Sequence, residues 1–336
     1  MYYCGFSQYK NLFFASIMST KIIVELCQNH AGNRETLKKM IQAAAKNGAD
    51  YVKIQTIFSE DLTKRERFEN GSQDASGKTL VIKRPHQSEV DRLSKLDLDL
   101  EDYEWFVEEC GRNGVIPITT IFSRHRIPAM AKISWPGRVV KVASYDCASY
   151  PMLKELADHF DEFIISTGAT YDEEIEKTAE LMKGLGKKFH FLHCVTSYPN
   201  TLDMTNLERM KWLRRFTDKV GWSDHTLVER DNILASKVAI MLGADFIERH
   251  FTILDRDKTK DGPISINPEL LKELDEFRKK TNDEQLAHLE KDFPEWKTLL
   301  GKPRREMTQT ELLNRDYYRG RFASPVDGGW KYNWED

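Results

Sequence analysis

The 336-residue sequence lacks most of the features that mark specialised proteins. Its 50 Lys and Arg nearly balance its 53 Asp and Glu, so the net charge is only −3 and nothing indicates a nucleic-acid partner. The cysteines number five, an odd count, and contain no CxxC pair, which argues against a disulfide framework and a zinc knuckle. This cysteine usage fits a reducing compartment, and we expect a cytoplasmic protein.

Long apolar runs are also missing. No stretch approaches the ~20 residues of a membrane span, so we expect no membrane partner. Residues 1–20 are rich in aromatics but have no basic segment followed by a clean apolar one, which argues against a signal peptide. We interpret residues 1–20 as an N-terminal leader, with Met18 as a candidate natural start.

Short β-branched or apolar runs alternate with amphipathic stretches of helical period. These runs occupy residues 21–28, 49–56, 115–122, 139–144, 163–168, 188–195, 219–225 and 246–252. Eight such alternations predict an α/β fold, a (β/α)8 TIM barrel over residues 21–284. Residues 57–100 form a polar insertion on the side where such barrels keep active-site loops, and residues 285–336 are expected to be a short irregular C-terminal extension.

Polar residues gather where the predicted strands end, at the face where barrel enzymes carry out their chemistry. Side chains two positions apart share a face of a strand, so Ser223 and His225 point inward together. His225 and His250 end neighbouring strands, so their imidazoles could meet at one cation. Two histidines with water and substrate oxygens suit Mn²⁺ or a similar divalent ion, although each could instead be a hydrogen-bonded core histidine.

Two lysines in otherwise apolar strands indicate an anion site. A lysine buried without a partner is costly, and an anion would supply that partner. Lysine provides a point charge, while hydroxyl groups fix the orientation of a phosphate or carboxylate. Alternatively, the lysines are solvated and the hydroxyls cap helices. The residues concerned are Lys53, Lys141, Thr120, Ser144, Ser166 and Ser223.

Nine separated motifs occur in one order: VELCQNHAGN, GADYVKIQT, ITTIFS, VKVASYD, ISTGAT, LHCVTSYP, GWSDHT, GADFIERHFT and DGP. With these motifs, the chain resembles the sialic acid synthase family over residues 21–281. That family condenses phosphoenolpyruvate with a sugar aldehyde, such as an N-acetylmannosamine-like sugar, to give a nine-carbon 2-keto sugar acid. The resemblance implies a carbon–carbon bond-forming transferase that requires Mn²⁺ or another divalent ion such as Mg²⁺ or Co²⁺, and a homodimer is a candidate assembly.

The resemblance also implies roles for individual residues. It places His225 and His250 at the metal, and it implies that Glu25, Gln55, Asp146 and Tyr198 face the acceptor sugar or the water at the metal. It implies that phosphoenolpyruvate is bound by Lys53, Thr120, Lys141, Ser144, Ser166 and Ser223. We expect Glu25, Lys53 and Lys141 to take part in catalysis.

The departures from the family pattern concern the acceptor side. Ile264 stands where the family usually has an aspartate, with Asp261 displaced nearby, and Thr196 replaces a polar amide. The resemblance further implies a C-terminal antifreeze-like domain whose arginine reaches the partner's site, and the chain holds only a linker-like remnant of that domain. Either Arg319 or Arg321 takes the role of that arginine, or the acceptor group that the arginine contacts is absent.

The sequence leaves open the role of the C-terminal end and two alternative functions. The aromatic end of the chain, Trp330, Tyr332 and Trp334, is expected to pack on a barrel, its own or a neighbour's. A related condensation could use a phosphorylated sugar and make a shorter 3-deoxy acid, which would need a cationic patch from Lys64, Arg65, Arg67, Lys83 and Arg84. Alternatively, the chain is a catalytically silent barrel that binds a sugar acid.

Overall fold

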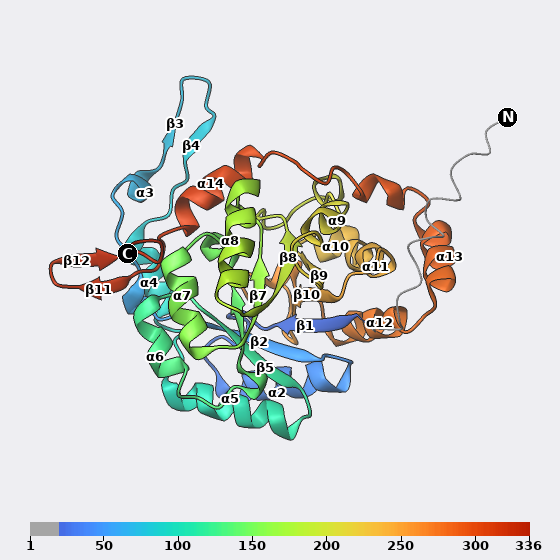
Figure 1. Ribbon diagram of the computed structural model, residues 1–336, viewed down its shortest axis with the longest axis horizontal. Coiled ribbons are helices and arrows are strands. Elements are labelled where there is room, and N and C mark those ends of the chain that lie inside the picture. Colours follow the sequence, from blue (N-terminus) through green and yellow to red (C-terminus); the bar gives the residue numbers. More distant parts are fainter. Residues whose placement is uncertain (1–19) are drawn as a thin grey trace.

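A computed structural model describes residues 20–336, so the predicted leader at 1–20 falls almost entirely outside the described residues. Eight parallel strands close into a barrel in the order β1-β10-β9-β8-β7-β6-β5-β2 (Figure 1). They are β1 (Lys21–Glu25), β2 (Tyr51–Thr56), β5 (Ile116–Ile121), β6 (Val139–Val142), β7 (Glu162–Ser166), β8 (Lys188–Cys194), β9 (Val220–Asp224) and β10 (Phe246–His250). The predicted α/β barrel is confirmed, and every predicted strand is present.

Helices surround the barrel where the sequence predicts amphipathic stretches (Figure 1). Their ends follow local rules: the Asn33 side chain accepts a hydrogen bond from the Thr36 amide at the start of α2, and Asp99 and Asp102 form a capping box at α5. The helices are α2 (Arg34–Lys46), α5 (Leu100–Arg112), α6 (Ile127–Met130), α7 (Tyr150–His159), α8 (Asp172–Gly184), α9 (Arg209–Leu213), α10 (Val228–Asp231), α11 (Leu234–Met241) and α12 (Pro268–Arg278). In the described part of the chain, no helix is both long and apolar enough to cross a membrane.

The barrel interior changes from apolar to polar along each strand. An apolar layer fills its lower part and consists of Ile23, Ile118, Val139, Ile164, Leu192 and Phe246. Since side chains two positions apart point to the same face, the next inward residue after each of these lies above the layer. Those next residues are Glu25, Thr120, Lys141, Ser166, Cys194 and Glu248. The apolar layer therefore forms the floor of a polar site at the carboxyl ends of the strands.

The insertion after β2 is compact. It contains the single turn η1 (Ser59–Asp61), the short helix α3 (Arg67–Asn70), a hairpin of β3 (Ser72–Gln73) and β4 (Thr79–Val81), and the helix α4 (His86–Leu93). The hairpin projects from the body of the molecule, whereas α4 lies against the barrel (Figure 1). The insertion thus brings α4 to the end of the barrel where the polar site lies.

The C-terminal region is more regular than we expected. It contains α13 (Asn282–Asp292), the turn η7 (Trp296–Leu299), α14 (Gln309–Tyr318) and the hairpin of β11 (Ser324–Val326) and β12 (Gly329–Lys331). The predicted boundary at residue 284 falls inside α13. Capping boxes at Thr281 and Thr308 begin α13 and α14. These caps favour helix formation although the apolar residues of the two segments show only a weak helical period.

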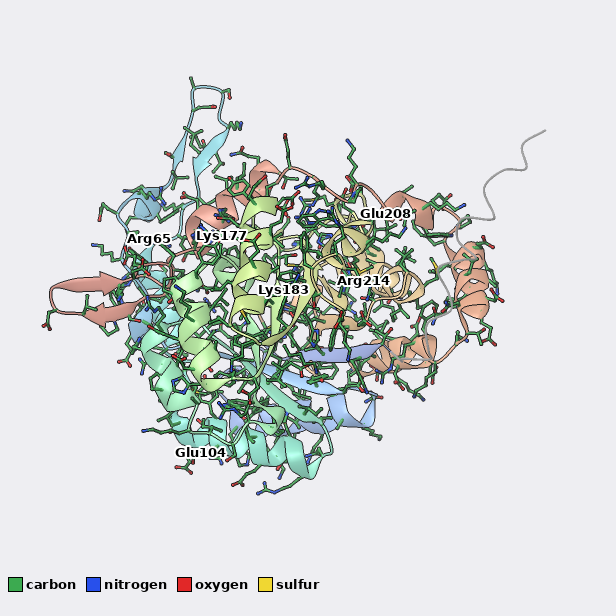
Figure 2. The ribbon with its side chains drawn as sticks, viewed as in Figure 1. Arg65, Glu104, Lys177, Lys183, Glu208 and Arg214 are labelled. Carbon is green, nitrogen blue, oxygen red and sulfur yellow. The ribbon has the colours of Figure 1, made fainter. Side chains whose placement is uncertain are left out.

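The insertion fixes the C-terminal segment, residues 308–336, across the barrel mouth. Arg65, labelled in Figure 2, donates hydrogen bonds to the carbonyl oxygens of Asp316, Tyr317 and Arg319. Thr63 donates to the carbonyl oxygen of Gly320 at 2.6 Å. Two polar elements far apart in the sequence therefore form one wall above the strands.

Candidate active site

A cavity of about 430 Å³ opens at the carboxyl ends of the strands. Every site residue predicted from the sequence lines it: Glu25, Lys53, Gln55, Thr120, Lys141, Ser144, Asp146, Ser166, Tyr198, Ser223, His225 and His250. A cavity of this size suits two small substrates bound side by side. The structure therefore brings all of the predicted site residues together in one cavity.

Two buried lysines and two buried carboxylates form an ionic centre at the bottom of the cavity. The Lys53 ammonium contacts the Glu25 carboxylate and lies 3.4 Å from the Thr120 hydroxyl. Lys141 donates to the Ser166 hydroxyl at 2.5 Å. Glu248 lies between the lysines, 4.0 Å from each ammonium group. Glu248, which the sequence pattern did not single out, thus links the two halves of the centre.

Burial and neighbouring charges shift the acidities in this centre. Burial, together with the charge of Lys141, lowers the pKa of Lys53 to about 8. Burial would raise the pKa of Glu248, but the charges of Lys141 and Lys53 lower it, and Ser223 donates a hydrogen bond to this carboxylate at 2.9 Å. One carboxylate oxygen of Glu248 has no hydrogen-bond partner in residues 20–336. The centre therefore presents charged groups whose hydrogen-bonding capacity is not fully used within the chain, as a polar ligand requires.

The two predicted metal histidines lie side by side, His225 directly after β9 and His250 at the end of β10. Their ring centroids are 5.3 Å apart and the rings are perpendicular. The Nδ1 of His225 lies 3.0 Å from the Val195 carbonyl oxygen, which can only accept, so Nδ1 carries the proton and Nε2 keeps its lone pair. Burial lowers the pKa of His225 to about 4 and that of His250 well below its ordinary value. Both imidazoles are therefore neutral, as metal ligands must be.

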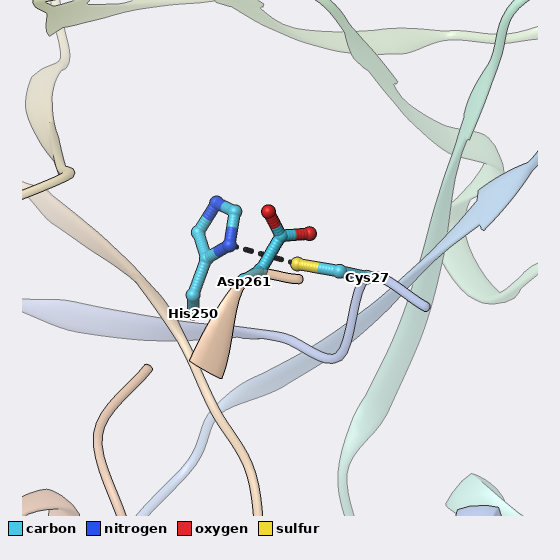
Figure 3. Close-up of side chains that lie close together, drawn as sticks. All are labelled: Cys27, His250 and Asp261. Carbon is cyan, nitrogen blue, oxygen red and sulfur yellow. Dashed lines mark hydrogen bonds between the residues drawn. The ribbon is translucent and has the colours of Figure 1, made fainter. Parts of the chain in front are cut away.

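A second group of donors joins His250, and sequence reasoning did not find it as a group. Cys27, His250 and Asp261 each place one ligand atom within 4.8 Å of the others (Figure 3). The Cys27 thiol lies 2.8 Å from Nδ1 of His250. Burial, with the charge of Asp261, raises the pKa of this thiol well above its usual range. Imidazole nitrogen and carboxylate oxygen in one cavity form a donor set that fits a divalent transition metal.

Two further histidines, His193 and His30, lie outside the cavity lining. His193 is buried against Trp222, and its Nε2 lies 2.7 Å from the Thr205 carbonyl oxygen. His30 accepts a hydrogen bond from the Gly32 amide at the start of the first helix region. Both histidines therefore make local hydrogen bonds to the backbone outside the cavity.

Asp224 points away from the cavity, as the parity of β9 predicts. Its carboxylate lies 2.7 Å from the Arg249 guanidinium and accepts hydrogen bonds from Thr226 and Ser236. Asp224 therefore positions the strand ends and α11 behind the two histidines.

The residues that depart from the family pattern on the acceptor side occupy different places in the structure. Ile264 and Thr196 are buried and do not line the cavity, whereas Asp261 lines it. The side chain of Asn314 in α14 donates to the Thr196 carbonyl oxygen at 2.7 Å and lines the cavity itself. Asn314, from a distant part of the chain, thus supplies a side-chain amide next to Thr196.

The C-terminal segment supplies much of the cavity rim. Tyr318 stacks on Tyr145 with ring centroids 4.9 Å apart, and the Asn333 amide donates to the Asp146 carboxylate at 3.0 Å. Of the two arginines weighed from the sequence, Arg321 lines the cavity, while Arg319 contacts Glu174 at 3.4 Å and lies over Trp334. The rim residues Asn314, Tyr318 and Asn333 could not be assigned to the site from local sequence patterns.

Comparisons with known proteins agree with this architecture. The NeuB family profile matches residues 40–286. An N,N'-diacetyllegionaminic acid synthase from Campylobacter jejuni is 30% identical over 76% of this chain and 74% of its own length. An N-acetylneuraminate-9-phosphate synthase from Drosophila melanogaster is 30% identical over 76% of this chain and 66% of its own length.

A solved structure shows the same fold. The N-acetylneuraminic acid synthetase of Leptospira borgpetersenii superposes with a TM-score of 0.65 at 24% identity, over 89% of this chain and 90% of that one. The barrel and its polar mouth define a synthase of the carbon–carbon bond-forming transferase class. The chain belongs to the NeuB family.

Proposed function

We propose that this chain condenses phosphoenolpyruvate with a sugar aldehyde of the N-acetylmannosamine type, giving a 2-keto-3-deoxy nonulosonic acid and phosphate. The observation that carries the proposal is one cavity in which two buried lysines face two neutral histidines. A lysine pair suits a small dianion, and neutral imidazoles suit a divalent cation. The names of the relatives support the same reaction class.

Phosphoenolpyruvate would lie over the ionic centre. Lys53 and Lys141 offset the charge on its phosphate, while the hydroxyls of Thr120, Ser144, Ser166 and Ser223 orient it. All of these groups line the cavity and are buried, so they are held in place before substrate arrives. Fixing both substrates in one enclosed site contributes a large part of the rate enhancement.

His225 and His250 would hold the divalent ion, with the Asp261 carboxylate as a further donor. We take the ion to be Mn²⁺, or another such as Mg²⁺ or Co²⁺, and bound there it supplies Lewis acidity towards the acceptor's carbonyl oxygen. Gln55, Asp146 and Tyr198 line the same cavity and would contact the acceptor.

The bond changes balance without an added oxidant or reductant. Carbon 3 of phosphoenolpyruvate forms a bond to the aldehyde carbon, and the aldehyde oxygen becomes a hydroxyl. A water oxygen adds at carbon 2, and the bond between carbon 2 and the phosphate oxygen breaks to leave the ketone and inorganic phosphate. Glu25, which accepts a hydrogen bond from the Cys27 amide at 2.6 Å, is held where it can orient that water.

Phosphate release tests the proposal directly. Purified protein with Mn²⁺, phosphoenolpyruvate and a panel of amino-sugars should release phosphate and give a product whose mass is the sum expected for the condensation. His225→Ala and His250→Ala should abolish turnover and Mn²⁺ retention after dialysis while the circular dichroism spectrum is unchanged. His159→Ala, at the far end of α7 and outside the cavity lining, is the matched control. Substantial turnover in either site variant would refute the assigned roles.

A further inference from the structure

His225 and His250 differ in the group that the ring nitrogen Nδ1 contacts. The Nδ1 of His225 lies against a backbone oxygen, the carbonyl oxygen of Val195. The Nδ1 of His250 instead lies 2.8 Å from the sulfur of Cys27 (Figure 3). Within residues 20–336, this thiol is the only hydrogen-bond partner of the His250 ring. The position of the proton on that ring therefore depends on Cys27.

The turn that follows β1 brings this thiol to the histidine. β1 pairs with β10 in a register that sets Glu25 opposite His250, and Cys27 follows two residues after Glu25. The backbone of Cys27 has a φ of 49°, and its amide donates a hydrogen bond to the Glu25 carboxylate at 2.6 Å. Side chains other than glycine rarely adopt such a φ, and buried residues held there are often functional. Cys27 is only 1% exposed, so water does not compete for its sulfur.

The neighbours of the thiol favour one direction for its hydrogen bond to His250. A thiol has one hydrogen to donate, and its sulfur can also accept. The Glu25 carbonyl oxygen lies 3.8 Å from the sulfur and can only accept, and the Asp261 carboxylate is a second oxygen acceptor within 4.8 Å. Since the thiol hydrogen has these oxygen acceptors, the sulfur is left to accept the hydrogen on Nδ1 of His250.

The direction of this hydrogen bond decides whether His250 can bind a metal through Nε2. A metal ion needs a ring nitrogen that keeps its lone pair, and Nε2 keeps it when Nδ1 carries the hydrogen. The Val195 carbonyl oxygen holds His225 in that tautomer. Metal-binding histidines commonly donate their second ring N–H to an acceptor, which fixes both the tautomer and the orientation of the ring. Without an acceptor at Nδ1, His250 would divide between two tautomers.

We propose that Cys27 is a positioning residue, whose sulfur accepts a hydrogen bond from Nδ1 of His250 and so keeps Nε2 of that ring available to the divalent ion. The proposal rests on the proposed function for the identity of the two metal-binding histidines. Cys27 lies outside the cavity lining and does not bind the ion itself. Its sulfur does for His250 what the Val195 carbonyl oxygen does for His225. Only the partner of His250 is a side chain, so a substitution can remove it.

Mn²⁺ binding measured by electron paramagnetic resonance tests the proposal without turnover. Cys27→Ala removes the acceptor and should raise the Kd for Mn²⁺ by about tenfold or more, as the loss of such a partner typically does. Cys27→Ser keeps a group that accepts and donates, so its Kd should stay within about threefold of wild type. The matched control is Cys110→Ala, which removes a buried free cysteine of α5 outside the cavity lining and should leave the Kd unchanged. Excess Mn²⁺ should restore turnover in Cys27→Ala, because Cys27 does not line the cavity that holds the substrates.

Nitrogen-15 NMR of the histidine rings in the metal-free chain measures the tautomer directly. The His250 signals, assigned by their loss in His250→Ala, should show the proton on Nδ1 in wild type and in Cys27→Ser, and a mixture of tautomers in Cys27→Ala. A proton on Nε2 in the wild type would overturn the proposal, and so would a folded Cys27→Ala whose Kd for Mn²⁺ stays within about threefold of wild type. The wild-type spectrum decides even if Cys27→Ala does not fold. A wild-type chain that binds no Mn²⁺ would refute the proposed function, and the NMR result would still decide the role of Cys27.

Discussion

Removing the Arg249 guanidinium should destabilise the barrel strongly. Arg249 lies 2.7 Å from Asp224, and the side chains of both residues are fully inaccessible to solvent. Replacement by Met keeps most of the side-chain volume but leaves the Asp224 carboxylate buried without a counter-charge. Breaking one side of a buried ion pair typically costs about 3–5 kcal/mol in the free energy of unfolding. We expect a loss in that range for Arg249→Met.

The ion pair of Asp224 and Arg249 lies directly behind the two predicted metal histidines. Asp224 adjoins His225 in sequence, and Arg249 adjoins His250, so the pair joins the ends of β9 and β10 behind the two histidines. Asp224 also accepts hydrogen bonds from the Thr226 amide at 2.9 Å and from Ser236 at 2.6 Å. These remaining contacts keep the carboxylate in place, which limits how far the variant can relax.

Urea denaturation followed by tryptophan fluorescence measures the effect. With a slope of roughly 1–3 kcal/mol per molar urea, the midpoint should fall by about 1 M or more. The matched control is Arg138→Met, whose partner Asp161 is 2.9 Å away on the surface, with side chains 52% and 60% exposed. That change should cost less than about 1 kcal/mol. An Arg249→Met variant within about 1 kcal/mol of wild type would refute the reasoning.

Three further predictions concern other parts of the fold. Deleting residues 325–336 removes Asn333 from Asp146, so the KM for the acceptor should rise while the KM for phosphoenolpyruvate stays constant; unchanged stability and activity would show the segment to be dispensable. Gly262→Ala places a methyl group 1.9 Å from the Arg256 carbonyl oxygen, so it should lower the free energy of unfolding by about 1–3 kcal/mol, as measured by thermal denaturation. The control Gly111→Ala in α5 places its methyl group in open space and should not destabilise the protein. A hydrogen bond from His190, with Lys188, lowers the pKa of Glu162 from 4.5 to about 2, so its stabilisation is present above about pH 4 and lost as the pH falls towards 2. Glu162→Gln should therefore cost about 1–2 kcal/mol at pH 7 and little at pH 2; an equal cost at both would contradict the assignment.

The barrel and the floor of the site could be predicted because their signals are local. Alternation along each strand sets which side chains point inward, and parallel strands end at one face. This alternation is enough to predict that Ser223 and His225 face the same cavity as Lys53, and that Asp224, which has the opposite parity to its two neighbours, points away from it.

The cavity rim could not be predicted because it depends on contacts between distant parts of the chain. Asn314 and Arg321 lie in a helix and a loop without a strong apolar period, and their place is fixed by the insertion some 250 residues earlier, where Arg65 holds Tyr317. Cys27 was missed for a different reason. A single cysteine gives no spacing pattern, and its backbone, at a φ of 49°, turns the thiol towards His250 in a way that no propensity predicts.

The C-terminal segment that covers the barrel mouth belongs to the same chain as the strands beneath it. Asn314, Tyr318 and Arg321 therefore stay beside Lys53 and His225 however dilute the protein becomes. The effective concentration of this wall is set by chain connectivity, not by association between molecules. We therefore expect specific activity to stay constant when the enzyme is diluted, because this wall cannot dissociate from the strands beneath it.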